Sequence, residues 1–178
     1  MTERESLERA RHEEVALVPY DPQWPLLFAA ERERLMGLFP SQLLDVQHFG
    51  STAIPGMPAK PIIDLLAGVE SMAVADSLVE PLLSSSYTTS AEFNATLTDQ
   101  RWFMRWFNGR RTHHLHVVVL GESQWYRRLR FRDVLRSNAE IAHRYALLKK
   151  QLAAQHCADR EAYTHAKAEF VLSVAGDA

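Results

Sequence analysis

A Gly-Ser pair and a downstream aspartate are the residues of this chain best suited to bind a phosphate. Gly50 and Ser51 follow the segment LLDVQHF, and twelve residues separate Ser51 from Asp64. Glycine allows close approach of a ligand, and successive backbone N–H groups with a hydroxyl can hold an anion. Asp64 lies within IIDLL, where a buried carboxylate needs a hydrogen-bond partner, a cation or a metal ion. The pattern predicts a phosphate site at Gly50, Ser51 and Thr52 beside a carboxylate.

The connection between these residues is unusually stiff. Pro55, Pro58 and Pro61 exclude a regular helix there and keep the backbone extended. Lys60 is a natural partner for phosphate. The segment is not a P-loop, because no Gly-Lys-Ser/Thr ends it. The alternatives are structural: a plain strand-to-loop turn at Gly50 and Ser51, and an ion pair between Asp64 and Lys60.

A second candidate region is the hairpin RWFMRWFNGRRTHHLHVVV, in which Asn108-Gly109 favours a two-residue type I′ turn. Strict alternation from that turn places one polar set on a single face: Arg101, Phe103, Arg105, Thr112, His114 and His116. His114 and His116 then converge toward a ligand or phosphate, whereas His113 points away. Two histidines do not complete a zinc site without His48 or Asp64. Arg101 and Arg105 bind either an anion or acidic residues of a covering helix.

The remaining pattern predicts an α+β (α/β) fold, a sheet covered by helices, in a single domain over residues 1–178. Residues 1–14 form a lead-in segment and residues 122–175 a helical C-terminal part. Strands are expected within 43–49 and 60–69. Helices are expected to begin at caps supplied by Asp21, Ser71, Ser123, Ser137 and Asp159. On the last helix Lys167 shares a face with Tyr163 and Phe170, which indicates packing or a further site residue.

Composition excludes several classes of protein. The chain has 178 residues with 47% hydrophobic and 24% charged, a net charge of -2 and a single cysteine, Cys157. These values argue against a disulfide framework, a membrane-spanning segment and a nucleic-acid partner. The arginine-rich run RRLRFRDVLR is interpreted as a solvated helix face. The charged first residues lack the apolar core of a secretory signal, so a cytoplasmic location is expected.

Five segments together resemble the GrpB family: VPYDPQWPLLFAAERERL, HFGSTAIPGMPAKPIIDLL, THHLHVV, WYRRLRFRDVLR and YTHAKAEF. The resemblance runs from about Val15 to Phe170. It implies a nucleotidyltransferase-like fold with a mixed sheet, and related domains occur fused to dephospho-coenzyme A kinases. It also implies that Asp64 and Ser51 are the catalytic candidates if the protein is an enzyme, with Asp64 as ligand of a divalent cation, Mg²⁺ or Mn²⁺.

One position departs from that pattern. Two-metal phosphoryl transfer uses two carboxylates, and the second position along the strand holds Leu66. Another acid, Asp45, Glu92 or Asp99, would have to converge on Asp64. Two hypotheses therefore stand: a protein that binds a nucleotide or phosphorylated small molecule and transfers a phosphoryl or nucleotidyl group, or a non-catalytic module with a degenerate metal site that binds a ligand or protein partner.

Overall fold

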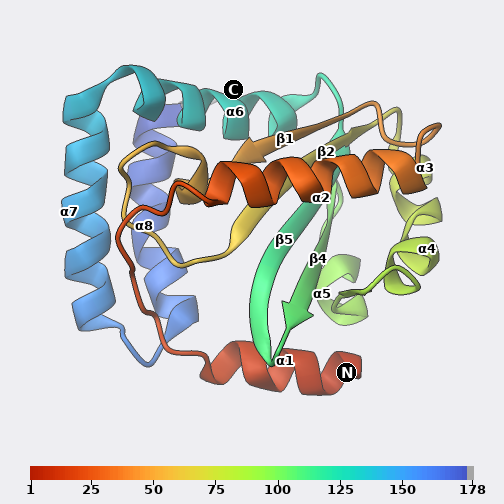
Figure 1. Cartoon of the computed structure of the whole chain (residues 1–178), viewed down its shortest axis with the longest axis horizontal. Helices are drawn as coiled ribbons and strands as arrows, with labels where there is room; N and C mark the ends of the chain where they lie inside the picture. Colours follow the sequence, from red (N-terminus) through yellow and green to blue (C-terminus); the bar gives the residue numbers. More distant parts are fainter. Residues whose placement is uncertain (176–178) are drawn as a thin grey trace.

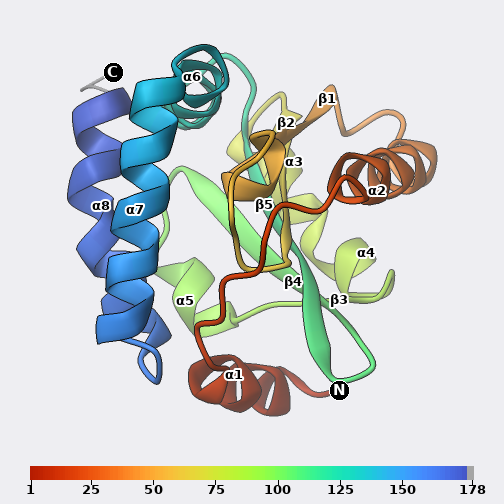
Figure 2. The same ribbon diagram turned by 60° about the vertical axis from the view of Figure 1, so that its left-hand side comes forward.

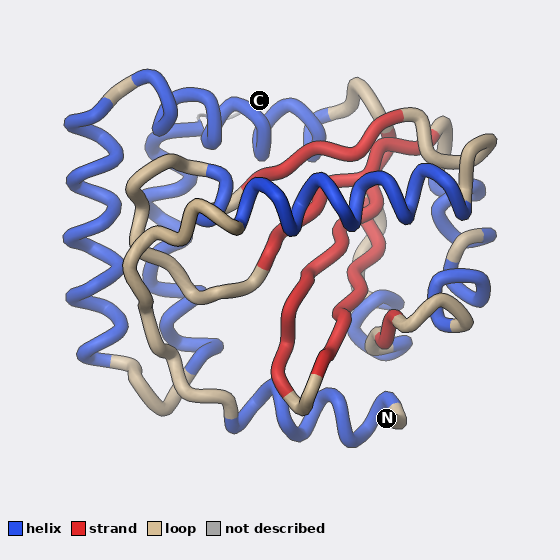
Figure 3. Tube along the Cα trace, viewed as in Figure 1, coloured by secondary structure: helices blue, strands red, loops and turns tan. Residues whose placement is uncertain are grey.

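Residues 1–175, the part of the chain that the computed structural model describes, contain one mixed β-sheet of five strands (Figures 1 and 3). The expected domain also includes residues 176–178, which lie outside this part. The strands are β1 (Asp45–Phe49), β2 (Ile63–Val69), β3 (Tyr87–Thr88), β4 (Gln100–Phe107) and β5 (Arg110–Val119). Their order is β1-β2-β5-β4-β3, with β2 and β5 parallel and the other neighbouring pairs antiparallel.

Helices cover both faces of this sheet, which confirms the expected α+β fold. They are α1 (Glu3–His12), α2 (Trp24–Leu38), α3 (Met72–Ser77), α4 (Val79–Leu83), α5 (Ala91–Ala95), α6 (Ser123–Ser137), α7 (Ala139–Gln155) and α8 (Arg160–Ala175). Figure 2 shows α7 and α8 on one side of the sheet and α2 and α4 on the other. None of the helices within residues 1–175 has the length and apolar character needed to cross a membrane.

The two faces of the sheet differ in chemistry. The face toward α2, α3 and α4 carries the larger core, to which the strands contribute Val46, Ile63, Leu65, Ala67, Val69, Tyr87, Phe103, Leu115 and Val117. The opposite face is apolar mainly beneath α6, where Leu66 and Val118 pack with Trp125. Further along this second face, β2 and β5 place Asp64 opposite His114. The second face therefore carries Asp64, His114 and His116.

The tip of the β4–β5 hairpin forms as predicted. Asn108 and Gly109 both have positive φ, 49° and 74°, as a type I′ turn requires. Phe107 pairs with Arg110 across the turn. The predicted turn is thus confirmed, including the residues at its centre.

Beyond the tip the register differs from the expected one by one residue. Arg105 pairs with His113 rather than with Thr112, so Thr112 is the extra residue of a β-bulge. Phe103 consequently pairs with Leu115 instead of His114. The expectation that Arg101, Arg105 and Phe103 share a face with His114 and His116 is wrong, because a one-residue shift exchanges the faces.

Several helices begin at other residues than predicted. The Asp21 carboxylate accepts a hydrogen bond from the Gln23 N–H at 2.9 Å and shapes a turn, and the helix begins only at Trp24, with Pro25 in its first turn. Ser71 caps α3 as predicted, accepting from the Val74 N–H.

Of the three caps predicted for the C-terminal helices, one is confirmed and two are wrong. Ser123 is the first residue of α6, and its expected place as cap is taken by Glu122. Ser137 ends α6, so Asn138 caps α7 instead. The predicted cap at Asp159 is present, since its carboxylate accepts from the Ala162 N–H at 2.9 Å.

Candidate anion-binding site

The Asp64 carboxylate lies directly against Gly50, where β1 ends. Gly50 has a φ of 70°, and a Cβ built on it would overlap the Asp64 oxygen Oδ2. Only glycine both tolerates this backbone conformation and leaves room for the carboxylate. Gly50 also precedes the 3-10 turn Ser51–Ala53. The Gly-Ser turn and the downstream aspartate are therefore in contact, as their types and spacing suggested.

A series of polar contacts connects Asp64 to His114 and Arg111 of β5. His114 Nδ1 lies 3.4 Å from Asp64 Oδ1, and Arg111 Nη1 donates to His114 Nε2 at 3.1 Å. A guanidinium can only donate, so Nε2 carries the lone pair and the imidazole proton sits on Nδ1, facing Asp64. The Arg111 Nε in turn donates to Glu13 at 2.8 Å. His114 is thus held as a neutral donor toward Asp64.

The titration behaviour of these groups agrees with that arrangement. Burial would raise the pKa of the Asp64 carboxyl, but His114, His116 and Lys167 outweigh it and bring the pKa to about 2. Burial lowers the pKa of His114, with Asp64 opposing the shift. Burial and then the charge of Arg128 lower the pKa of His116 strongly. Near neutral pH the site contains an ionised carboxylate beside two neutral imidazoles.

Two lysines approach each other on the α8 side of the site. The Lys60 and Lys167 ammonium groups lie 5.3 and 5.1 Å from the centre of the Tyr163 ring. Burial first, and then repulsion by Lys167 and Arg160, lower the pKa of Lys60 to about 6. An amine with that pKa lacks a sufficient anionic partner in the protein. An added anion would relieve the repulsion.

A third lysine comes from α7. Lys149 is 1% exposed, and its ammonium donates to the Pro58 carbonyl at 2.5 Å. Burial and then Lys167 lower its pKa to about 7, against the attraction of Asp64. Burial likewise raises the pKa of Tyr145 to about 12, and the adjacent Ser51 hydroxyl partly offsets this. The proline-rich loop, Ser51 and α7 therefore meet at one place.

Two half-buried arginines complete the surroundings. Arg128 of α6 donates to the Gln100 side chain at 2.7 Å, and burial lowers its pKa to about 10. Arg160 of α8 lies 3.5 Å from Glu13, and burial followed by repulsion from Arg111 lowers its pKa to about 10. Within the described residues, Arg160 Nε and Nη1 and the Tyr163 hydroxyl have no hydrogen-bond partner although they are buried.

We call six of these side chains the basic cluster: Lys60, Arg111, Arg128, Lys149, Arg160 and Lys167. The carboxylates that counter them are Asp64, Glu13 and Asp99. Within residues 1–175 these six basic groups face three carboxylates, in a region where burial makes an uncompensated charge costly and keeps Lys60 and Lys149 partly neutral. Such an excess is suited to a multiply charged anion.

Some residues predicted for this site lie elsewhere. Arg101 pairs with Asp76 at 2.7 Å and Arg105 with Glu31 at 2.5 Å, both toward the helices of the opposite face. This is the structural alternative, an acidic partner on a covering helix. The Thr52 hydroxyl, 1% exposed as a residue, lies 2.9 Å from His48 Nε2 and is therefore engaged by the protein.

The interpretation of RRLRFRDVLR as a solvated face is wrong for part of α6. Arg132 Nη1 donates to the His48 carbonyl at 3.0 Å, and Arg136 Nε donates to the Ala53 carbonyl at 2.8 Å. With Arg128 in the basic cluster, three arginines of this run turn toward the protein. They hold α6 against the Gly50–Ser51 turn.

The donor set does not fit the two-metal arrangement that a nucleotidyltransferase-like fold implies. Leu66 is fully buried, and no group of three or more His, Cys, Asp or Glu within residues 1–175 is arranged to hold a metal ion. Asp45 pairs with Arg32 at 3.2 Å, and β1 aligns it with Gly68, four residues beyond Asp64. Asp99 accepts from Gln124, and the exposed Glu92 lies on α5. The expected second carboxylate is not supplied by these three acids.

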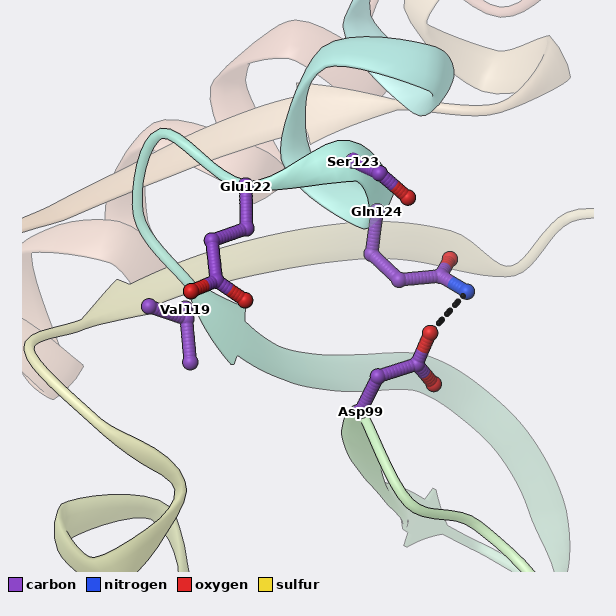
Figure 4. A pocket seen from close by; sticks show the side chains of 5 residues that line it. All are labelled: Asp99, Val119, Glu122, Ser123 and Gln124. Carbon is purple, nitrogen blue, oxygen red and sulfur yellow. Dashed lines mark hydrogen bonds between the residues drawn. The ribbon is translucent and has the colours of Figure 1, made fainter. Parts of the chain in front are cut away.

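A separate small hollow is lined by Asp99, Val119, Glu122, Ser123 and Gln124 (Figure 4). Its volume is about 60 Å³, and Gln124 spans it to Asp99 at 2.9 Å. Ligand sites generally need about 300 Å³ or more. The hollow suits water, and its two carboxylates disfavour a phosphate.

Sequence reasoning missed four members of the cluster: Arg111, Arg128, Lys149 and Arg160. Three of them lie on helices far along the chain, where a charged residue ordinarily indicates a solvated face. The fourth is turned toward His114 by the bulge at Thr112, which alternation alone cannot reveal. Lys60, His114, His116 and Lys167 are brought together around Asp64, and their role in binding remains a prediction.

Comparisons with known proteins bear on this arrangement. The model of the family described as GrpB protein matches residues 14–176. The crystal structure of the conserved protein GrpB from Enterococcus faecalis superimposes with a TM-score of 0.80 at 34% identity, covering 90% of this chain and 94% of that one.

Two curated relatives are longer than the matched region. UPF0157 protein YqkA of Bacillus subtilis is 39% identical over 157 residues, which is 88% of this chain but 45% of that protein. A dephospho-CoA kinase of Mycolicibacterium paratuberculosis is 49% identical over 76 residues, 41% of this chain and 19% of the kinase. The chain thus spans less than half of either protein.

Proposed function

This chain belongs to the GrpB family, and from this premise we propose that it binds a phosphorylated small molecule or nucleotide through the basic cluster. The observation that carries the proposal is the excess of buried and half-buried basic groups around one ionised carboxylate. Lys60 and Lys149 have pKa values of about 6 and 7, so each is short of negative charge in the free protein. Phosphate oxygens would supply it.

Each part of the cluster has a role in this proposal. Lys60, Lys149 and Lys167 neutralise the phosphate charge, and the unpartnered N–H groups of Arg160 donate to phosphate oxygens. Gly50 and Ser51 line the place where α7 meets the proline-rich loop. Asp64, kept ionised by His114, accepts a hydroxyl of the ligand rather than contacting phosphate.

The donor set supports a binding module more than a two-metal transferase. Within residues 1–175, Leu66 and the dispersed acids leave Asp64 without a second carboxylate, so the proposal includes no metal-dependent step. A protein partner is the remaining alternative if no small ligand binds. The partial likeness to a dephospho-CoA kinase makes coenzyme A precursors part of the ligand panel.

The test is calorimetric titration with tripolyphosphate, pyrophosphate, nucleotides and dephospho-coenzyme A, each in EDTA and in Mg²⁺. We expect metal-independent binding that Lys60→Met and Lys167→Met weaken at least tenfold. Lys150→Met is the matched control, because Lys150 neighbours Lys149 on α7 but is exposed. Binding only with Mg²⁺ would restore the transferase hypothesis, and no binding at millimolar ligand would favour a protein partner.

A further inference from the structure

An aromatic pair, the half-buried Trp102 and the exposed Phe93, adjoins the basic cluster. Trp102 of β4 pairs with His116 of β5, so both side chains lie on the face of Asp64. The Trp102 ring meets the His114 ring edge-on, with centroids 5.7 Å apart. It also meets Phe93 of α5, at 5.6 Å and 86° between the rings. Phe93 is 47% exposed.

This pair is held in place by buried hydrogen bonds. The Asn94 side chain, 8% exposed as a residue, accepts from the Trp102 N–H at 2.9 Å and donates to the Trp102 carbonyl at 3.3 Å. Ser90 caps the short helix by accepting from the Phe93 N–H at 3.0 Å. The backbone that carries both rings is therefore held in place before any ligand arrives, which reduces the entropy cost of binding.

We infer that Trp102 and Phe93 receive the base of a nucleoside polyphosphate whose phosphates occupy the basic cluster. The inference rests on the proposed function and extends it to one ligand class. Trp102 lies two strands from Asp64 and two residues further along the sheet, a backbone separation of about 12 Å. That is the reach from the base of a nucleotide to its outer phosphates. A cluster of six basic groups, of which Lys60 and Lys149 can take up protons, matches a polyphosphate better than a monophosphate.

The energetics favour a planar ring over an aliphatic ligand. Base–aromatic stacking contributes about 1–3 kcal/mol, a factor of about 5 to 150 in affinity. The contact is independent of base identity, because every base has a π-face. The aromatic pair thus predicts a preference for nucleotides over inorganic polyphosphate of equal charge, with little discrimination between bases.

The test compares ATP with tripolyphosphate by titration calorimetry on the full chain in EDTA. We expect ATP to bind at least fivefold more tightly. Trp102→Leu and the surface change Phe93→Leu should each remove most of that difference and leave the tripolyphosphate affinity within twofold. Phe107→Leu is the control, because Phe107 is 70% exposed at the hairpin tip, away from the cluster.

The outcomes separate the two proposals. If tripolyphosphate binds and ATP binds no better, or if the aromatic variants weaken both ligands equally, the inference fails and the proposed function stands. If neither ligand binds to the wild-type protein, both are overturned. The Phe93→Leu variant keeps the test decisive should Trp102→Leu fail to fold.

Discussion

Replacing Lys60 by methionine should stabilise the free protein while weakening its binding of phosphate. Burial and like charges lower the Lys60 pKa from 10.5 to about 6 in the folded protein. In the unfolded chain the amine is protonated at neutral pH, so folding at pH 7 requires its deprotonation. The free-energy cost of this deprotonation is about 1.4 kcal/mol for each pH unit between pH 7 and the pKa of the unfolded chain, or about 5 kcal/mol in total.

Two effects reduce the measurable gain. Lys60 retains partial exposure, and solvent screening lowers the electrostatic cost. The variant also loses the contact of the ammonium with the Tyr163 ring, about 0.5–1 kcal/mol. We therefore expect Lys60→Met to raise the free energy of unfolding by about 2–3 kcal/mol at pH 7.

The pH dependence gives the decisive assay. Because the folded protein binds fewer protons than the unfolded chain between pH 6 and 10.5, wild-type stability gains from rising pH in that window. The penalty is complete below about pH 6 and vanishes above the unfolded pKa. Urea unfolding should show a gap between variant and wild type that narrows steadily toward alkaline pH. A gap independent of pH, or a variant less stable at every pH, would refute the reasoning, and Lys150→Met should show no gap.

Three further results are expected. Gly50→Ala should destabilise the protein by about 2–4 kcal/mol in urea unfolding. Gly56→Ala should cost only about 1 kcal/mol, because Gly56 has a similar φ of 78° but open space for the Cβ. Equal losses of stability in the two variants would contradict the overlap with Asp64. Arg105→Met should lower stability by leaving Glu31 short of a partner, yet leave tripolyphosphate affinity unchanged, and a weakened affinity would return Arg105 to the site. Tripolyphosphate binding near pH 8 should take up protons as the Lys60 and Lys149 pKa values rise on contact with phosphate, so its calorimetric enthalpy should depend on the buffer; a buffer-independent enthalpy would count against lysine contacts.

The sequence predicted local features well where one residue type decides the geometry. Asn108-Gly109 forms the expected turn because both positions need positive φ, and Ser71 and Asp159 cap their helices because each side chain accepts a nearby N–H. The prediction that Asp21 caps a helix is wrong, because a carboxylate of this kind can also close a turn just before a helix. A polar residue near a helix start thus indicates a boundary only to within a few residues.

The composition of the site was harder to foresee because it depends on tertiary packing. Gly50, Ser51 and Asp64 could be found, since their types and their spacing within fifteen residues carry the signal. Lys149 and Arg160 could not, because a lysine or arginine on an amphipathic helix has the same local pattern whether it faces solvent or a buried carboxylate. Only the packing of α7 and α8 against the proline-rich loop distinguishes the two.

Because of the bulge at Thr112, the hydrogen bond between Arg111 and His114 depends on the number of residues in the β4–β5 hairpin and not only on its side chains. Arg111 reaches His114 because one surplus residue lies between them in β5. Inserting one residue into β4 between Arg105 and Trp106 would give Thr112 a partner, remove the bulge and turn Arg111 toward the opposite face. Glu13 would then be disconnected from Asp64 although every functional side chain is still present. Among relatives of this protein, a one-residue insertion at this point of β4 would therefore mark functional divergence that a count of matching residues overlooks.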